Sequence, residues 1–225
     1  MGDRRNALAF APLDDPSDIT VEGRVSQSPA WSTSKVLIVA AFLDTVADRD
    51  PDRVSKANRS LIEDALIRSD EDAVVRLRRQ IPGRPGRAMT AVLRDIGDRT
   101  TVAPDTYTGL MPWTVREQVR FMAALANGRV VSQAASAYLM KTTRPIRAYA
   151  WGLGTIGATT YKGGWLRRDT VTRQMGIVDG YAVAIITDGV GPAVRQDDGD
   201  SAHVQQMNKL ARLLERRLDD ERSRR

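Results

Sequence analysis

The sequence predicts an α/β (α+β) fold in which both ends of the chain build one antiparallel sheet and helices fill the middle. Strand-like apolar runs occur near the N-terminus and again beyond residue 148. Between them, apolar residues recur at helical spacing. The last two strand-like runs are separated by Asp179-Gly180, a strong hairpin signal. We expect one compact unit, with a sheet subdomain of residues 1–35 plus 149–225, flanked by helices, and an inserted all-helical subdomain of residues 36–148.

The N-terminal third contains the stretch around which the chain is organised. Residues 7–13 and 19–25 are apolar and strand-like, with a turn cluster between them. Residues 32–47 follow, and no charge occurs from Val36 to Leu43. A helix that is apolar all round is buried on every side. A buried strand is the alternative, because Val and Ile are common in the run.

Ser32 and Lys35 lie at the mouth of this predicted helix. Residues three apart share a helix face, so the hydroxyl and the amine can meet. A desolvated lysine titrates lower and can activate a serine nucleophile. Alternatively, Ser32 only caps the helix and the amine of Lys35 reaches out to solvent.

The middle of the chain reads as a series of helices. The pattern of residues 60–77 is helical but is interrupted by polar residues 68–72, and a loop precedes a helix at 88–96 that stops at Gly97. Residues 98–112 show no period and are expected to be a loop. Thr114 and Glu117 form a capping-box pattern at the start of a helix over 114–126, which Asn127-Gly128 ends. Another short helix is expected over 132–140.

The helical spacing of apolar residues ends after residue 147. A Gly-rich segment leads to Tyr161-Lys162-Gly163-Gly164-Trp165, which is expected to open a strand. Strands over 170–178 and 181–187 flank the predicted hairpin. A loop over 188–200 leads to an amphipathic helix over 202–218, and the charged tail 221–225 is expected to fray.

The composition excludes several kinds of chemistry. The 225 residues include no Cys, which excludes disulfides, a Cys nucleophile and thiolate metal sites. The single histidine, His203, lies at the front of the last helix, where we interpret it as a surface or packing residue rather than a catalytic one. A Ser-His-Asp triad and a His-based zinc site are therefore disfavoured. We expect no metal and no cofactor.

The charge balance is basic, at a formal net charge of +6, and nearly all of the cations are arginines. Clusters such as residues 76–79 and 216–217 read as solvated helix faces, without the interleaved aromatics of a nucleic-acid binder. We expect no nucleic-acid partner, a small-molecule or peptide substrate and a monomer. No run is long enough to span a bilayer, and no secretory leader core follows the polar residues 1–6.

Three short motifs occur in a characteristic order: Ser32-Thr33-Ser34-Lys35, Ser69-Asp70-Glu71 and Lys162-Gly163-Gly164. Their order and context fit the Ser-x-x-Lys, Ser-Asp-Asn and Lys-Thr-Gly set of penicillin-recognising serine enzymes. Over essentially its whole length the chain resembles class A β-lactamases and their DD-peptidase relatives, which implies the β-lactamase/transpeptidase-like fold. Further segments that resemble the family are Trp31-Ser32-Thr33-Ser34-Lys35-Val36-Leu37, Ala65-Leu66-Ile67-Arg68-Ser69-Asp70, Met111-Pro112-Trp113-Thr114 and Trp151-Gly152-Leu153-Gly154.

The resemblance implies four catalytic residues. Ser32 would be acylated, and Lys35 would take its proton directly or through water. Ser69 would relay a proton to the leaving nitrogen, while Lys162 would bias that hydroxyl and attract a substrate carboxylate.

The same resemblance implies the substrate-binding residues Glu71, Gly163, Gly164 and Trp165. The backbone N–H groups of Ser32 and Trp165 would form an oxyanion hole. The two glycines would let a substrate backbone lie along the strand edge.

The chain departs from the family at three points. Glu71 stands where the family has Asn, which places a charge near Lys35. Gly163 stands where the family has Thr or Ser, so a carboxylate-binding hydroxyl is missing. The stretch 100–110 has no Glu to activate a deacylating water, and Asp105 is its only carboxylate. We therefore expect slow deacylation with β-lactams.

The leading hypothesis is a serine acyl hydrolase acting through an acyl-enzyme on an amide, lactam or ester, as a weak β-lactamase, a peptidase or an esterase. The alternative is a non-catalytic relative that binds a cell-wall peptide or a protein partner. A plain DNA-binding helical protein is a third reading that no motif supports. The resemblance implies a secreted or cell-envelope location in bacteria, with a leader absent from this chain, and a cytoplasmic location is the alternative.

Overall fold

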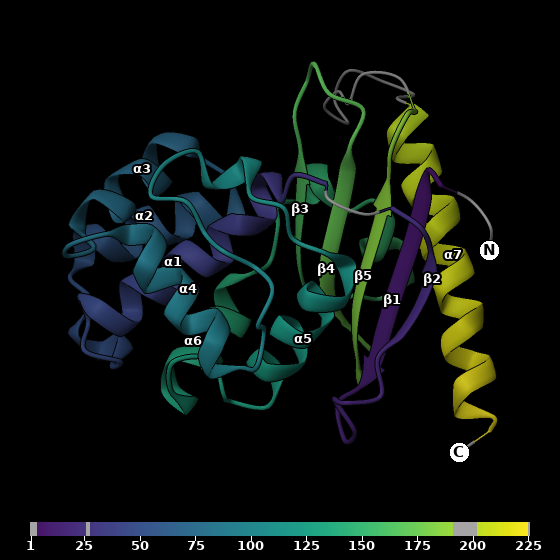
Figure 1. Ribbon diagram of the computed structural model, residues 1–225, viewed down its shortest axis with the longest axis horizontal. Coiled ribbons are helices and arrows are strands. Elements are labelled where there is room, and N and C mark those ends of the chain that lie inside the picture. Colours follow the sequence, from purple (N-terminus) through teal and green to yellow (C-terminus); the bar gives the residue numbers. More distant parts are fainter. Residues whose placement is uncertain (1–3, 26–27, 191–201, 225) are drawn as a thin grey trace.

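The computed structural model describes residues 4–25, 28–190 and 202–224, and Figure 1 shows a sheet with helices on both sides. The sheet has five antiparallel strands in the order β2-β1-β5-β4-β3. Their bounds are β1 (Asn6–Pro12), β2 (Thr20–Gly23), β3 (Thr160–Trp165), β4 (Thr172–Val178) and β5 (Tyr181–Thr187). Strand β1 lies beside β5, so both ends of the chain build one sheet and the predicted α/β (α+β) fold is confirmed.

The predicted hairpin joins β4 to β5. Asp179 and Gly180 have φ values of 45° and 82°, and the residues on either side, Val178 and Tyr181, are paired. Positive φ at both central residues is what a type I′ turn needs, and its twist matches that of the flanking strands.

Seven helices surround the sheet in the described part of the chain. They are α1 (Ser34–Thr45), α2 (Lys56–Ile67), α3 (Glu71–Gln80), α4 (Pro85–Asp95), α5 (Val115–Ala126), α6 (Gln133–Thr142) and α7 (Ala202–Arg222). Helices α5 and α7 both pack on β5 and β1, and their apolar side chains belong to two separate clusters on the two sheet faces. The helices α1 to α4 and α6 lie together at one side of the sheet (Figure 1).

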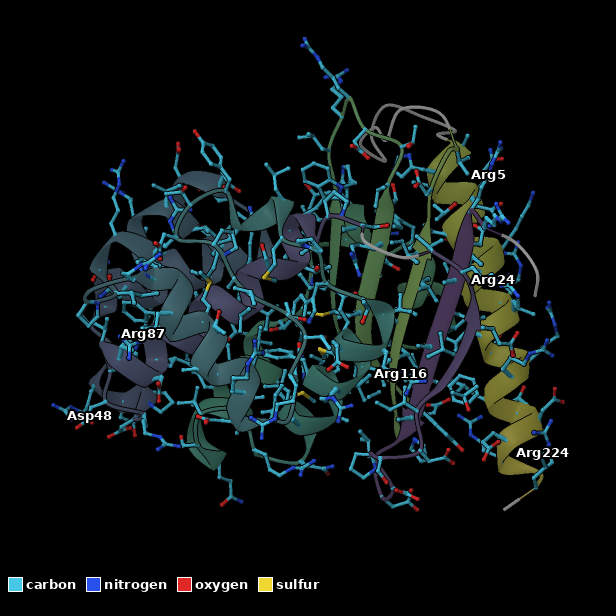
Figure 2. All side chains as sticks on the ribbon, viewed as in Figure 1. Arg5, Arg24, Asp48, Arg87, Arg116 and Arg224 are labelled. Carbon is cyan, nitrogen blue, oxygen red and sulfur yellow. The ribbon has the colours of Figure 1, made fainter. Side chains whose placement is uncertain are left out.

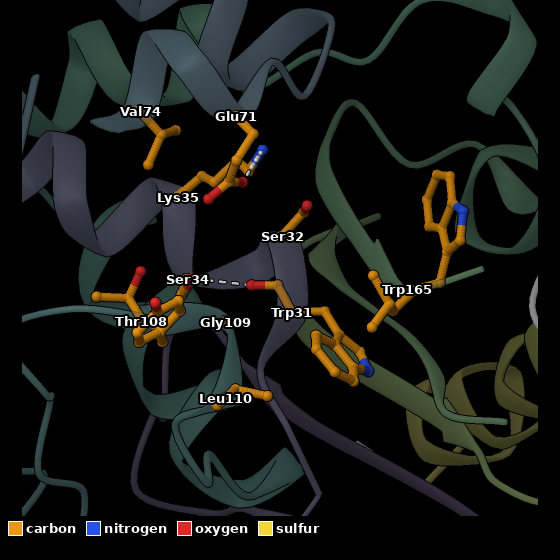
Figure 3. A pocket seen from close by; sticks show the side chains of 12 residues that line it. Trp31, Ser32, Ser34, Lys35, Glu71, Val74, Thr108, Gly109, Leu110 and Trp165 are labelled. Carbon is orange, nitrogen blue, oxygen red and sulfur yellow. Dashed lines mark hydrogen bonds and ion pairs between the residues drawn. The ribbon is translucent and has the colours of Figure 1, made fainter. Parts of the chain in front are cut away.

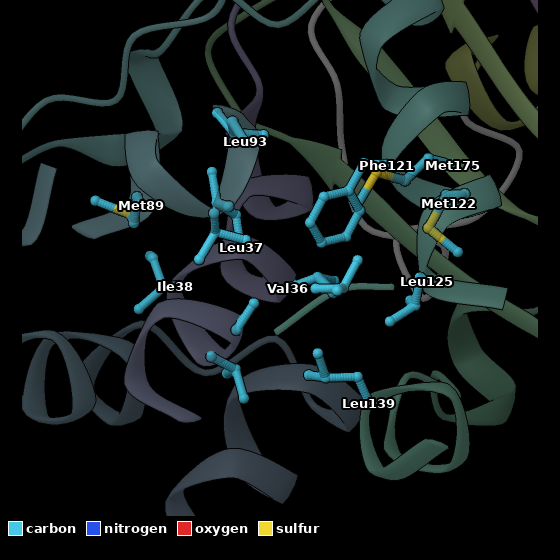
Figure 4. Close-up of a cluster of buried hydrophobic side chains, with 14 of the residues drawn as sticks. Val36, Leu37, Ile38, Met89, Leu93, Phe121, Met122, Leu125, Leu139 and Met175 are labelled. Atoms are coloured by element: carbon cyan, nitrogen blue, oxygen red, sulfur yellow. The ribbon is translucent and has the colours of Figure 1, made fainter. Parts of the chain in front are cut away.

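Helix α1 is buried on every side, as its charge-free sequence predicts. Residues Ser34 to Leu43 are all buried, and helices α2, α3, α4 and α6 pack around it. The strand alternative for this run is therefore wrong. Side chains that surround α1 in Figure 4 include Met89, Leu93, Phe121, Met122, Leu125, Leu139 and Met175.

Several element boundaries differ from the predicted ones. The expected helix over 60–77 is two helices, because Ser69 has a left-handed φ of 60° that no helix can continue. Helix α4 begins three residues early, since Pro85 has the fixed φ of a first helical position. The predicted loop over 188–200 lies mostly outside the described residues.

The C-terminal helix is longer than the sequence predicts. It continues to Arg222, whose guanidinium pairs with Asp219 at 2.9 Å and Asp179 at 3.2 Å. The expectation that residue 221 onward frays is therefore wrong for Glu221 and Arg222. His203 is buried at the start of this helix and packs against Trp151, in keeping with a packing residue.

The arginines that give the chain its basic charge lie mostly on the outside. Arg5, Arg24, Arg87, Arg116 and Arg224 are exposed and belong to different parts of the molecule (Figure 2). Among the helices of the described ranges, none combines the length and the apolar content that crossing a membrane requires.

Candidate active site

Ser32 lies in a tight turn, η1 (Trp31–Thr33), that runs directly into α1. Trp31 adopts a φ of 45°, which is strained for a bulky residue and is typical of functional turns. A backbone hydrogen bond fixes the start of this turn: the Ala30 N–H donates to the Met111 carbonyl at 2.8 Å. The Thr33 hydroxyl donates to the Ala30 carbonyl at 2.5 Å. Ser32 is therefore presented at the mouth of a buried helix by a constrained backbone.

A buried arginine braces the segment that leads to this turn. The Arg173 guanidinium donates to the carbonyls of Ser28 at 3.1 Å and Pro29 at 2.9 Å, and also to that of Trp113. It donates to Gln118 Oε1 at 2.8 Å as well. Burial lowers the pKa of Arg173 to about 9, so the group is still a cation at neutral pH.

Gln118 connects this arginine to the nucleophile turn. Its Nε2 donates to the Thr33 hydroxyl at 2.8 Å while its Oε1 accepts from Arg173. The motif search missed both Gln118 and Arg173. An arginine within the strand-like run 170–178 is the signal that could have drawn attention to Arg173.

Lys35, Ser69, Glu71 and Lys162 come together in one hydrogen-bonded cluster. Lys35 Nζ donates to the Ser69 carbonyl at 2.6 Å and forms an ion pair with Glu71 Oε2 at 3.0 Å. Lys162 Nζ donates to Ser69 Oγ at 2.8 Å and to the Gly163 carbonyl at 3.1 Å. Four of the predicted site residues, from α1, the α2–α3 connection, α3 and β3, thus share one small region.

The conformation of Ser69 allows it to contact both lysines. Its left-handed φ turns the chain sharply between α2 and α3. Asp70 then caps α3, because the Ala73 N–H donates to Asp70 Oδ1 at 2.7 Å. The carbonyl of Ser69 faces Lys35 and its hydroxyl faces Lys162.

Burial changes the protonation of the lysines. It lowers the pKa of Lys35, although the carboxylates of Glu71 and Asp70 act in the opposite direction. Burial also lowers the pKa of Lys162 well below its usual value, and the positive charge of Lys35 lowers it further. Two buried ammonium groups around one serine repel each other, which favours a neutral amine in this pair.

Strand β3 passes very close to the nucleophile turn. A Cβ on Gly164 would lie 2.8 Å from the Ala30 carbonyl oxygen and 2.9 Å from the Ser32 nitrogen. Tyr161 donates its N–H to Thr143, away from β4, and alternate residues of a strand direct their N–H groups to the same edge. The Trp165 N–H is therefore directed to the outer edge of β3, as a second oxyanion donor beside Ser32 would need.

Ser32 opens into a cleft of about 330 Å³, which we call the nucleophile cleft (Figure 3). Its lining residues are Trp31, Ser32, Ser34, Lys35, Glu71, Val74, Tyr107, Thr108, Gly109, Leu110, Trp165 and Leu166. Within the part of the chain that the structure describes, Ser32 Oγ forms no hydrogen bond. The direct hydroxyl–amine contact that the spacing allows is thus not made, and Lys35 contacts Ser69 and Glu71 instead.

Asp105 does not belong to the nucleophile cleft. Its carboxylate accepts from Arg84 Nε at 3.0 Å and from the Gly86 N–H at 3.0 Å. The hydrogen bond from Arg84 is the main cause that lowers the pKa of Asp105. This carboxylate thus anchors the loop that follows α4 to the start of the same helix. Across the described ranges, no group of three or more His, Cys, Asp or Glu side chains is placed to hold a metal ion.

A serine at the start of a buried helix, facing an edge strand of an antiparallel sheet that both chain ends build, is the arrangement of the β-lactamase/transpeptidase-like fold. Comparison with solved structures shows this fold directly. The chain is similar to a β-lactamase from Chitinophaga pinensis DSM 2588, with a TM-score of 0.72 and 15% identity over 95% of this chain and 93% of that one.

Two further solved structures agree. PBP-A matches with a TM-score of 0.70 and 19% identity over 96% of this chain and 90% of that one. The extended-spectrum β-lactamase TLA-3 matches with a TM-score of 0.68 and 14% identity over 95% and 94%. No protein-family model matches the chain, and no curated protein matches it by sequence.

Proposed function

We propose that this protein is a serine acyl hydrolase that acts through an acyl-enzyme on Ser32. One observation carries the proposal: Ser32 Oγ faces the same cleft as Lys35, a lysine whose side chain is only 4% exposed. A desolvated lysine beside a serine can hold a neutral amine and accept the hydroxyl proton. Solved neighbours described as β-lactamases share this fold and support the same class of reaction.

Acylation would proceed as follows. Ser32 Oγ forms a bond to the substrate carbonyl carbon, and its proton passes to the neutral amine of Lys35. The carbonyl oxygen, now negative, is stabilised by the N–H groups of Ser32 and Trp165. The carbonyl carbon then loses its bond to the leaving nitrogen or oxygen, which takes a proton from Ser69 Oγ. Lys162 passes a proton to Ser69 across their 2.8 Å hydrogen bond, and the proton that Lys35 took from Ser32 replaces it through solvent, so both lysines end as they began.

Water completes the cycle by attacking the acyl carbon, which releases a carboxylic acid and restores the Ser32 hydroxyl. This step is expected to be slow with β-lactams. Asp105 is bound to Arg84 and Gly86, away from the nucleophile cleft. Glu71 lines the cleft but is paired with Lys35. The acyl-enzyme therefore accumulates, and β-lactamase activity is weak.

The Lys35–Glu71 ion pair favours one alternative function. A carboxylate 3.0 Å from the amine opposes the burial that lowers the pKa of Lys35, and it favours the protonated amine. If this effect dominates, Ser32 lacks a base, and the protein binds a cell-wall peptide or a protein partner without reacting.

Intact-protein mass spectrometry after incubation with a penicillin and with an activated ester tests the proposal. The parent protein is expected to gain the acyl mass, and Ser32→Ala is expected to lose this gain. Ser34→Ala is the matched control, because the Ser34 hydroxyl already donates to the Trp31 carbonyl at 2.7 Å. No adduct and no turnover would support the binding protein instead. A β-lactam turnover near ten per second, ordinary for enzymes, would refute slow deacylation.

A further inference from the structure

Several large apolar side chains around the nucleophile cleft are exposed to solvent. Tyr107, Leu110 and Leu166 line it, with exposed fractions of 78%, 57% and 49%. Trp31 and Trp165 form further parts of its wall (Figure 3). Exposed apolar side chains that cluster at a pocket mark a site for an apolar group.

This apolar wall is attached to the nucleophile turn itself. A Cβ on Gly109 would lie only 3.5 Å from Trp31 Cα, so the turn that carries Tyr107 and Leu110 is in direct contact with η1. The hydrogen bond from Ala30 to Met111 holds the end of the same segment. An apolar group on this wall is therefore adjacent to the acylated hydroxyl.

The cations of the site already have protein partners. Lys35 contacts Glu71 and the Ser69 carbonyl, and Lys162 contacts Ser69 Oγ. The described residues that line the nucleophile cleft include no arginine and no histidine. The Glu71 side chain is 72% exposed at the cleft and would repel an anion. A substrate carboxylate in this cleft would thus face the exposed negative charge of Glu71. Lys35 and Lys162, the cations of the site, already have protein partners.

We propose that the acyl group accepted by this site is uncharged and apolar, and that a short aliphatic ester or amide represents its substrate class. The inference rests on the proposed acyl-enzyme chemistry and specifies the acyl side of its substrate. The cleft volume of about 330 Å³ lies at the small end of ligand pockets, which suits a short chain.

Acylation by three 4-nitrophenyl esters tests the inference: the acetate, the hexanoate and the hemiglutarate, which ends in a carboxylate. Each buried methylene contributes a factor of about four, so the hexanoate is expected to acylate Ser32 at least about tenfold faster than the acetate. The hemiglutarate is expected to be no faster than the acetate. Rates come from the released 4-nitrophenolate and from the adduct mass.

Three variants test whether the preference for an apolar acyl group arises from the wall of the nucleophile cleft. Leu110→Ala and Leu166→Ala are expected to lower the hexanoate-to-acetate ratio. Val102→Ala is the matched control, because Val102 is 65% exposed but lies outside the nucleophile cleft, and it is expected to leave the ratio unchanged. A ratio that all three variants preserve would overturn the assignment.

The possible failures are distinguishable. Adducts on Ser32 that form equally fast from all esters, or fastest from the hemiglutarate, overturn this inference and leave the proposed function standing. Absence of any adduct refutes the proposed function instead. Titration of Ser32→Ala with hexanamide and with glutaric acid monoamide, followed by tryptophan fluorescence, then tests the preference without a reaction. Tighter binding of hexanamide supports it, and equal or weaker binding overturns it.

Discussion

Replacement of Gly164 by alanine perturbs the contact between β3 and the nucleophile turn. The added Cβ would meet three backbone atoms: the Ala30 oxygen at 2.8 Å, the Ser32 nitrogen at 2.9 Å and the Thr33 nitrogen at 3.0 Å. None of these atoms belongs to a flexible side chain, so the strand and the turn must move apart. Gly164→Ala therefore displaces the Ser32 and Trp165 N–H groups relative to each other.

The size of the effect follows from this geometry. Overpacking by a methyl group costs about 1–3 kcal/mol, and for a chain of this size 1 kcal/mol corresponds to about 2–4 °C in melting temperature. A loss of about 2–12 °C is expected. Loss of one oxyanion donor lowers the rate by about 10²–10³-fold, and acylation of Gly164→Ala is expected to fall by that factor.

Acylation by an activated ester, measured with the thermal melt of the same sample, separates the two effects. Gly83→Ala is the control, because Gly83 has a φ of +69° and no atom within 4 Å of an added Cβ. A left-handed alanine costs about 1–2 kcal/mol, so the control loses similar stability without touching the cleft. If Gly164→Ala is acylated as fast as Gly83→Ala, the close approach of β3 plays no part in catalysis.

Three further predictions concern charged groups. Glu71→Gln removes a carboxylate that raises the pKa of Lys35, so the pH profile of acylation should move to lower pH; an unchanged profile would exclude Lys35 as the titrating base. Arg173→Met leaves the buried Trp113 carbonyl and the half-buried Pro29 carbonyl without this donor, at about 1–3 kcal/mol each, and urea unfolding should show a loss of about 2 kcal/mol or more, which Arg173→Lys should not rescue. Burial and Asp98 raise the pKa of Glu117 above 4.5, so its contribution to stability is present below about pH 4.5 and is lost as pH rises through the folded-state pKa. Glu117→Gln should therefore gain stability relative to the parent at pH 7 but not at pH 4, and equal differences at both values would contradict this.

The sheet and the central helix could be predicted because their signals are local. The turn chemistry of Asp179-Gly180 defines the β4–β5 hairpin, and a run of eight residues without charge, Val36 to Leu43, defines a helix buried on all sides. The break at Ser69 could be located but not interpreted, because a polar stretch does not reveal a left-handed residue.

The hydrogen bonds by which Arg173 and Gln118 support the nucleophile turn could not be predicted, because these two residues form no local sequence pattern. Arg173 and Gln118 lie 55 residues apart, and Arg173 binds backbone carbonyls, which every residue carries. The apolar wall escaped prediction for a related reason. Tyr107 and Leu110 are ordinary residues of an aperiodic stretch, and only the folded structure shows that they stay exposed beside Ser32.

The position of β1 has a consequence for the order in which the protein can be made. Asn6 pairs with Thr187, so β1 has no inner neighbour until β5 has left the ribosome. Such long-range pairing slows folding and leaves an early strand edge open to wrong partners. The helices between the strands can collapse first, but Arg173 and Gly164 reach the nucleophile turn only with the last strands. Ser32 should therefore become reactive only after β3, β4 and β5 have been synthesised.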